Sequence, residues 1–220
     1  TNALDANTTA SNNTAVGDGS LKANTTGHSN VAVGKSAMAT NTTGINNTCL
    51  GMSSLTSNTS GGSNVGMGIN SLLSNTTGSN NVAIGQQSLN GNTTASNSTA
   101  VGYQALLTNT TGAGNTAVGA NALDANTTGD NNTAIGLSAL GVNTTGLENI
   151  AIGNYALDAN TNGTNNTAVG YNTLSANTSA VNNTAIGAQS LAAATTGSYN
   201  TAVGNNTLQA HTTGNYNVAM

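Results

Sequence analysis

The feature that most constrains this chain is a 17-residue repeat that runs through all 220 residues without insertion or deletion. One copy of its most regular segment is Asn132-Thr133-Ala134-Ile135-Gly136, and thirteen copies or close variants occur, the last cut off at Met220. A short, unbroken period means that one structural unit is stacked on itself and that each unit contacts its neighbours. The period predicts a single repetitive segment over 1–220, which we expect to be part of a longer protein.

Within each copy, a β-branched or aliphatic residue alternates with a small one, as in Thr133-Ala134-Ile135. This period of two is typical of a β-strand. After the glycine and two variable positions comes a small residue followed by an almost pure leucine column, which we interpret as a second short strand. The fold class expected is all-β: a parallel β-solenoid or β-roll of about thirteen coils, with two short strands per coil. Rungs about 4.8 Å apart would give a rod of roughly 60 Å.

The two sides of the strand predict a core and an assembly face. We expect the large aliphatic side chains to form the core ladder: Val16, Val33, Ile84, Ile135, Leu21, Leu106 and Leu140. The opposite side offers only small residues, for example Ala15, Ala134, Gly17 and Gly136. A recurrent glycine implies either a positive φ or another backbone close by. We therefore expect this side to pack against other copies of the chain, most simply around a three-fold axis.

Each repeat turns through Asn-Thr-Thr-Gly or a close variant, and the first threonine of this corner is present in all thirteen repeats. We expect these threonine hydroxyls to form a ladder of hydrogen bonds from coil to coil. Ten corners also begin a sequon and are candidate glycosylation sites: Asn7, Asn24, Asn41, Asn58, Asn75, Asn92, Asn109, Asn126, Asn143 and Asn177. A patchier second row of sequons begins at Asn12, Asn46, Asn97, Asn131, Asn165 and Asn182. The alternative is that Asn and Thr serve only as turn residues.

Composition argues against most other functions. Charged residues make up 4% of the chain, with two Lys+Arg in all, so no basic patch exists for nucleic acid. No apolar run approaches the ~20 residues of a membrane span. His28 and His211 are 183 residues apart and the acids are scattered, so we expect no catalytic site, metal or cofactor, and no enzyme activity. Cys49 stands in the alanine column and is expected to be a small buried side chain.

The repeat resembles a known class of fibrous proteins. Asn81-Val82-Ala83-Ile84-Gly85-Gln86-Gln87-Ser88 is similar to the head repeats of trimeric autotransporter adhesins. The form Thr-Ala-Val-Gly-Tyr-Gln-Ala-Leu, from Thr99 to Leu106, looks still more like repeats of phage and bacterial tail-fibre-type proteins. The resemblance covers the whole chain and implies a left-handed parallel β-roll that associates as a homotrimer.

These observations together predict a structural fibre or adhesin segment, a rigid rod for attachment at an extracellular, cell-surface or virion-surface location. The expected partners are other copies of the chain, in a trimer or a filament, and a cell-surface glycan or protein receptor. Two alternatives stay open at this point. One is a self-polymerising extracellular filament, with or without attached glycans. The other is a lectin-like receptor-binding domain that uses the variable columns of the repeat.

Overall fold

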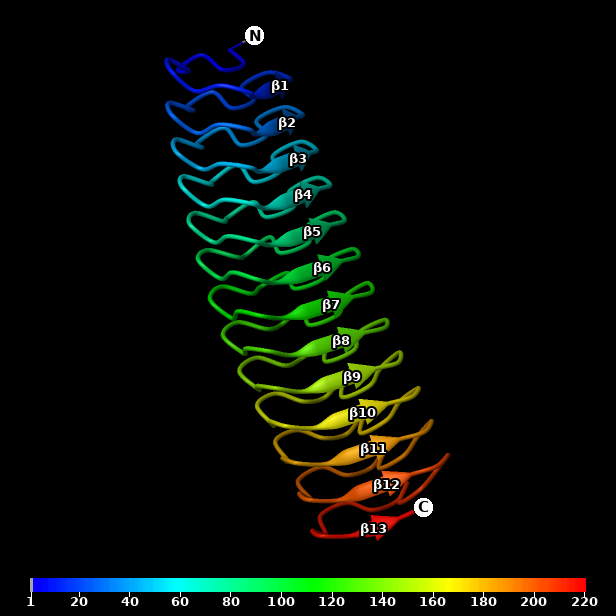
Figure 1. The fold of residues 1–220 in the computed structure, drawn as a ribbon. Helices are drawn as coiled ribbons and strands as arrows, with labels where there is room; N and C mark the ends of the chain where they lie inside the picture. The colour runs from blue at the N-terminus through cyan, green and yellow to red at the C-terminus, as the bar shows by residue number, and fades with distance from the viewer. Residues whose placement is uncertain (1) are drawn as a thin grey trace. The chain divides into compact units, whose positions relative to one another are not determined.

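The computed structural model describes residues 2–220 and divides into two compact units, Thr1–Thr111 and Gly112–Met220. Each unit is a parallel β-solenoid with one short strand per coil (Figure 1). The first unit contains β1 (Thr14–Val16), β2 (Val31–Val33), β3 (Thr48–Leu50), β4 (Val65–Met67), β5 (Val82–Ile84) and β6 (Thr99–Val101). The second contains β7 (Thr116–Val118), β8 (Thr133–Ile135), β9 (Ile150–Ile152), β10 (Thr167–Val169), β11 (Thr184–Ile186), β12 (Thr201–Val203) and β13 (Val218–Ala219).

The strands pair in parallel with a register of one repeat. Thr133 lies opposite Ile150 and Ala134 opposite Ala151, and the same offset of 17 residues holds for the other pairs within each unit. Parallel strands need a connection that returns the chain to its starting edge. Here the remainder of each 17-residue repeat makes that return. The predicted all-β parallel solenoid with a 17-residue period is therefore confirmed.

The prediction of a second strand in each coil is wrong. The leucine segment is built of turns, in which Leu140 has φ 52° and the preceding Ser138 also has φ 52°. Every second residue of this segment therefore has a left-handed backbone conformation. This spacing has the same period of two as the side chains of a strand, which is why the sequence pattern suggests a strand. The segment still bonds to the next coil, since the Leu140 amide donates to the Ala156 carbonyl at 3.0 Å.

Leucine is an unusual residue in the left-handed region, where an L-residue is strained by about 1–2 kcal/mol. Burying its side chain contributes roughly 1.5–3 kcal/mol, which offsets that strain. Leu21, Leu106 and Leu140 are all completely buried, so this part of the predicted core ladder is confirmed. The leucine column is the main large apolar component of the interior.

The sides predicted for the strand are reversed. Ala134 is completely buried inside the coil, as are its counterparts in β2 to β12, whereas Ala15 and Ala219 in the two end strands are half-buried. Ile135 faces outward and is 38% exposed, and Val16 is 56% exposed. The members of the predicted core ladder that point outward are Val16, Val33, Ile84 and Ile135. The alanine side was therefore not an assembly face.

The reason for this reversal is the narrow interior of the coil. At Gly66, which replaces alanine in β4, an added Cβ would lie 2.5 Å from Ser54 Oγ and 3.2 Å from Ser71 Oγ. Those hydroxyls belong to the segments that precede the leucines on the return path. The inner side of the strand therefore has room only for small side chains, Ala in most coils and Cys49 in β3, so the larger side chains must point outward.

The predicted close approach at the glycine column is confirmed, but its partner differs from the expectation. Gly136 has φ 134°, and an added Cβ would lie 2.6 Å from the carbonyl oxygen of Gly153. Gly17 meets Gly34 in the same way. The backbone that excludes a side chain is thus the next coil of the same chain, and not another copy of the protein.

Two ladders of buried asparagine side chains complete the interior. We call the asparagines that open the Asn-Thr-Thr-Gly corners of successive repeats the corner amide row. The asparagines that directly precede the strands form the strand amide row. In the strand amide row, Asn132 Nδ2 donates to the Gly146 carbonyl at 2.8 Å. Its Oδ1 accepts from the Asn149 backbone amide at 3.0 Å. Polar groups inside the coil are thus paired from rung to rung, as burial requires.

Candidate assembly surface

The outward side of each strand forms a regular, uncharged surface. We call it the aliphatic face, defined by the first and third residues of each strand. The third position is Val, Ile, Leu or Met in β1 to β12, and the first is Thr, Val or Ile. Exposure is large: Leu50 is 52% and Ile186 41% exposed. Parallel rungs about 4.8 Å apart place these side chains in two straight columns within each unit.

The aliphatic face is unusual for the surface of a single chain. Isolated apolar side chains are common on protein surfaces. A contiguous apolar strip that follows every strand of a sheet is typical of a surface that packs against something else. Of the predicted site residues, Val16, Val33, Ile84 and Ile135 are brought together here, within their own units. The aliphatic face, and not the alanine side, is therefore the candidate for the predicted assembly face.

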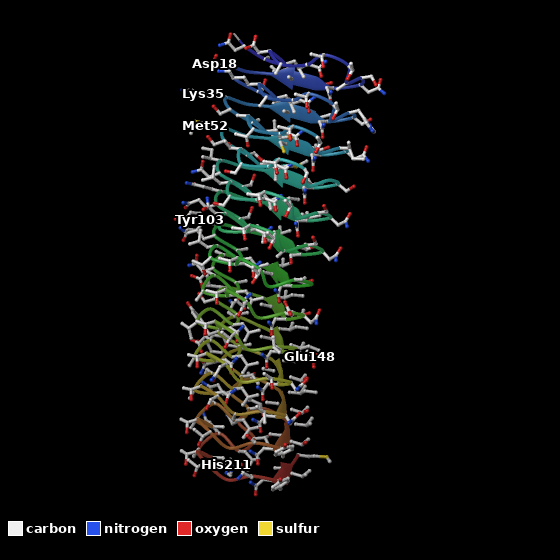
Figure 2. The ribbon with its side chains drawn as sticks, turned by 90° about the vertical axis from the view of Figure 1, so that its left-hand side faces the viewer. Asp18, Lys35, Met52, Tyr103, Glu148 and His211 are labelled. Atoms are coloured by element: carbon white, nitrogen blue, oxygen red, sulfur yellow. The ribbon has the colours of Figure 1, made fainter. Side chains whose placement is uncertain are left out.

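The turn after the glycine column carries the variable side chains of the repeat. In the first unit, Asp18, Lys35, Met52 and Tyr103 project along one edge (Figure 2). In the second unit, Tyr155 and Tyr171 pack edge to face with ring centroids 6.4 Å apart. Charged, apolar and aromatic side chains follow one another along this edge without a repeating chemistry.

The candidate glycosylation sites lie inside the coil. From Asn24 onward the corner amide row is completely buried, and Asn7 in the first coil is half-buried. Asn58 is representative: its Nδ2 donates to Asn41 Oδ1 at 2.7 Å and to the Gly61 carbonyl at 2.9 Å. From Asn24 to Asn177, the folded protein has no room for a glycan on these amides. The prediction that they are glycosylation sites is therefore wrong for these nine asparagines in the folded chain, and at Asn7 it stays a prediction.

Two late corners show how the corner amide row accommodates an interruption. Ala194 replaces asparagine, and Asn177 Oδ1 then accepts from the Ala180 amide at 3.0 Å. In the following coil His211 stands in the same column, and its Nε2 lies 2.9 Å from the Gly214 carbonyl. A histidine at this position is thus a structural substitute for asparagine. This geometry explains His211 without a metal.

The predicted threonine ladder is confirmed on the outside of the corner. Thr42 Oγ1 donates to the Thr59 carbonyl at 3.0 Å, and Thr144 Oγ1 to the Thr161 carbonyl at 3.0 Å. The same bond is made by the corner threonines from Thr25 to Thr93 and from Thr127 to Thr195. The first threonine of the corner therefore ties each coil to the next, which explains why it occurs in every repeat.

The few titratable groups are explained by packing. Cys49 is buried in the alanine column as expected, and burial raises the pKa of its thiol to about 12. Burial also raises the pKa of the Asp124 and Asp158 carboxyls. These two acids belong to coils two repeats apart, and each carries hydrogen bonds from its own turn.

Residues 2–220 form no pocket, and no three side chains among His, Cys, Asp and Glu gather there into a metal-binding group. The same residues contain no helix suited to crossing a membrane. The aliphatic face is the candidate functional surface of this chain.

No protein-family model, curated protein or solved structure matches this chain. The similarity of its repeats to adhesin heads and tail-fibre proteins accordingly stays a prediction. The architecture alone, a parallel β-solenoid with a 17-residue period, is established by the structure.

Sequence reasoning missed the two amide ladders, which are the most regular feature of the interior. Asparagine is a common turn residue and turns are usually exposed, so the sequence predicts that the side chains of the corner amide row lie on the surface. A usable indication was present, because both asparagine columns hardly vary while the columns on the edges change freely. In a solenoid with a narrow interior, a polar column of constant identity is a sign of buried, paired groups.

Proposed function

We propose that this chain is a structural segment of a fibre that packs laterally against other copies of itself through the aliphatic face. The observation that carries the proposal is the unbroken outward column of Val, Ile, Leu and Met on successive strands. Covering such a column removes apolar surface from water, which contributes about 25 cal/mol for each Å². A flat, repetitive face also lets a second copy make the same contact at every rung.

The interior is suited to a rigid, load-bearing element. Within each unit, successive coils are joined by strand pairing, by two amide ladders and by the threonine ladder. These interactions repeat with the same geometry and do not create a pocket. We infer a role in reach and attachment at an extracellular, cell or virion surface, as the resemblance to adhesin and tail-fibre repeats also suggests. No catalytic role is part of this proposal.

Solution mass tests the proposal directly. Light scattering on the native protein should give a discrete multiple of 21.3 kDa, a trimer if the resemblance to adhesin heads extends to assembly. Open-ended polymers would favour the self-polymerising filament. A mass of 21.3 kDa at high protein concentration would remove lateral assembly from consideration.

A matched pair of variants locates the contact. Ile84→Lys with Ile135→Lys places one charge on the aliphatic face of each unit and should yield folded monomers. The control is Thr26→Lys with Thr128→Lys, which places the same charges on exposed corners. This control should assemble like the parent protein. If both double variants assemble equally well, the aliphatic face is not the interface.

A further inference from the structure

The corner amide row carries an inference about how this protein is made, which does not depend on the proposed assembly. We propose that the chain folds without prior exposure to an N-glycosylating oligosaccharyltransferase. Ten of its corner asparagines are sequons by sequence, and nine of these, from Asn24 to Asn177, are also completely buried structural amides. A glycan on any of these nine is incompatible with the coil.

The geometry shows why the amide must remain bare. Asn41 Nδ2 donates to Asn24 Oδ1 at 2.9 Å and to the Gly44 carbonyl at 3.1 Å. Asn143 Nδ2 has the equivalent two bonds, at 3.0 Å to Asn126 Oδ1 and 3.1 Å to the Gly146 carbonyl. Both amide hydrogens are therefore in use, in a position with no exposed surface.

Glycan transfer would remove one of these hydrogens. The enzyme forms a bond between Nδ2 and the anomeric carbon of a sugar. It breaks the bond from that carbon to the pyrophosphate of a lipid-linked donor, and the amide proton leaves. One ladder bond is then lost and a branched, hydrated group must enter a space that fits only an amide. Because each coil depends on its neighbours, a single glycan disrupts the contacts on both sides of its rung.

Burial in the final fold gives no protection when the transferase acts before folding. An enzyme that modifies the chain during its passage across a membrane meets Asn-Thr-Thr as an extended segment. All ten corner sequons are then acceptors, and those that are modified cannot enter the ladder. A chain of this sequence is therefore suited to a compartment, or an export route, in which that enzyme is absent.

The second row of sequons provides an internal contrast. Asn131 and its five counterparts lie in turns with φ near 60° and are exposed. Asn162 and Asn205 begin two further exposed sequons. A glycan on these eight side chains would project into solvent without breaking a ladder bond. Glycans on the corner amide row are thus incompatible with the fold, whereas glycans on these exposed sequons are not.

The test uses a variant that removes the corner sequons and keeps every corner asparagine. The third residue of each sequon is exposed and is changed to alanine: Thr9, Thr26, Thr43, Ser60, Thr77, Thr94, Thr111, Thr128, Thr145 and Ser179. Parent and variant are each produced in a bacterial cytoplasm and through a eukaryotic secretory pathway. Intact mass, site mapping by mass spectrometry, circular dichroism and protease resistance are measured.

We expect both proteins to fold from the bacterial cytoplasm with unmodified mass. From the secretory pathway, the parent should carry glycans on corner asparagines and be protease-sensitive, whereas the variant should be folded with glycans confined to the exposed sequons. A folded parent from the secretory pathway, with its corner asparagines either bare or glycosylated, would overturn the proposal. A variant that folds in the cytoplasm but fails in secretion would overturn it too.

A second measurement covers the case in which ten alanines destabilise the variant in both hosts. The parent is then produced through the secretory pathway while synthesis of the lipid-linked donor is inhibited. Recovery of a protease-resistant, unmodified protein supports the proposal. Persistent misfolding without glycans contradicts it. Lateral assembly is measured separately on cytoplasmic protein, so a failure of one proposal is distinguishable from a failure of the other.

Discussion

Asn58 shows how much of the fold a single buried amide holds together. Its Nδ2 bridges Asn41 Oδ1 and the Gly61 carbonyl, and its Oδ1 accepts from Asn75 Nδ2 at 2.9 Å. Asn58→Ala leaves Asn75 with a buried donor that has lost its acceptor, and each such group costs about 1–3 kcal/mol. We expect the free energy of unfolding, measured by denaturant titration, to fall by about 2–3 kcal/mol.

The control for this change is Thr43→Ala, at an exposed position of a neighbouring corner. An exposed substitution away from special features should change stability by less than about 0.5 kcal/mol. Equal losses for the two variants would mean that the corner amide row contributes no more to stability than the surface does.

We expect the same substitution to have opposite effects at two glycines, Gly66 in the alanine column and Gly136 in the glycine column. At Gly136 the added methyl group would meet the backbone of Gly153, and φ is positive. At Gly66 the nearest atom is Ser54 Oγ, which can rotate to the Gly51 carbonyl as Ser71 Oγ does to that of Gly68. Gly66→Ala should therefore stabilise the protein by about 0.4–1 kcal/mol, and Gly136→Ala should destabilise it by more than that.

Thermal unfolding monitored by circular dichroism measures both glycine variants side by side. Gly136→Val should have a larger effect than Gly136→Ala, because it adds two further carbon atoms against the same backbone. A stable Gly136→Val protein would show that the close approach of the glycine columns can be relieved cheaply.

The buried thiol of Cys49 should make the free energy of unfolding depend on pH in the alkaline range. Its thiol has a pKa of about 12 in the folded state, raised from 9.0 chiefly by burial. The unfolded chain therefore loses the proton first, and stability falls as the pH rises from about 9 towards 12. Cys49→Ala places in β3 the residue that most other coils have there, and it should remove this part of the pH dependence. Native Cys49 should also resist alkylation at pH 8 and react after unfolding.

At the scale of the elements, the strand and the leucine segment contribute differently to the single chain. Leu140 is completely buried, so Leu140→Ala should cost about 2–5 kcal/mol. Ile135 is 38% exposed, and Ile135→Ala in dissociated, monomeric protein should cost clearly less. Denaturant titration at low protein concentration makes the comparison. A larger loss of unfolding free energy for Ile135→Ala than for Leu140→Ala would instead support the prediction from the sequence, in which Ile135 faces the core.

The sequence predicted the period, the parallel pairing, the buried leucines and the threonine ladder, because each of these follows from strict recurrence at a spacing of 17. It did not predict which side of Thr133-Ala134-Ile135 faces inward. The alternation of large and small residues shows that the strand has two different sides. Which of these sides faces the interior depends on how wide the coil is. That width depends on the return segment, where left-handed residues such as Leu140 replaced the expected strand.

At the scale of the whole molecule, few charges contribute to stability. The chain has two Lys+Arg and six Asp+Glu among 220 residues, whereas its ladders consist of neutral amides and hydroxyls. Salt screens charge–charge interactions and has little effect on neutral hydrogen bonds. We expect the free energy of unfolding to change by less than about 1 kcal/mol when the ionic strength rises from about 0.05 to 0.5 M. A larger change in denaturant titration would point to an electrostatic contribution that the fold does not show.

The offset of one repeat between hydrogen-bonded neighbours has a kinetic consequence. Most contacts between coils join residues about 17 positions apart in a chain of 220, so the relative contact order is about 17/220, or roughly 0.08. Helical bundles have values of about 0.07–0.12, and all-β sandwiches about 0.16–0.22. The low value arises because every coil closes a loop of the same short length, although the protein consists of strands and turns. Once a first pair of coils has formed, folding can proceed by adding one short loop at a time, at a rate more typical of helical proteins.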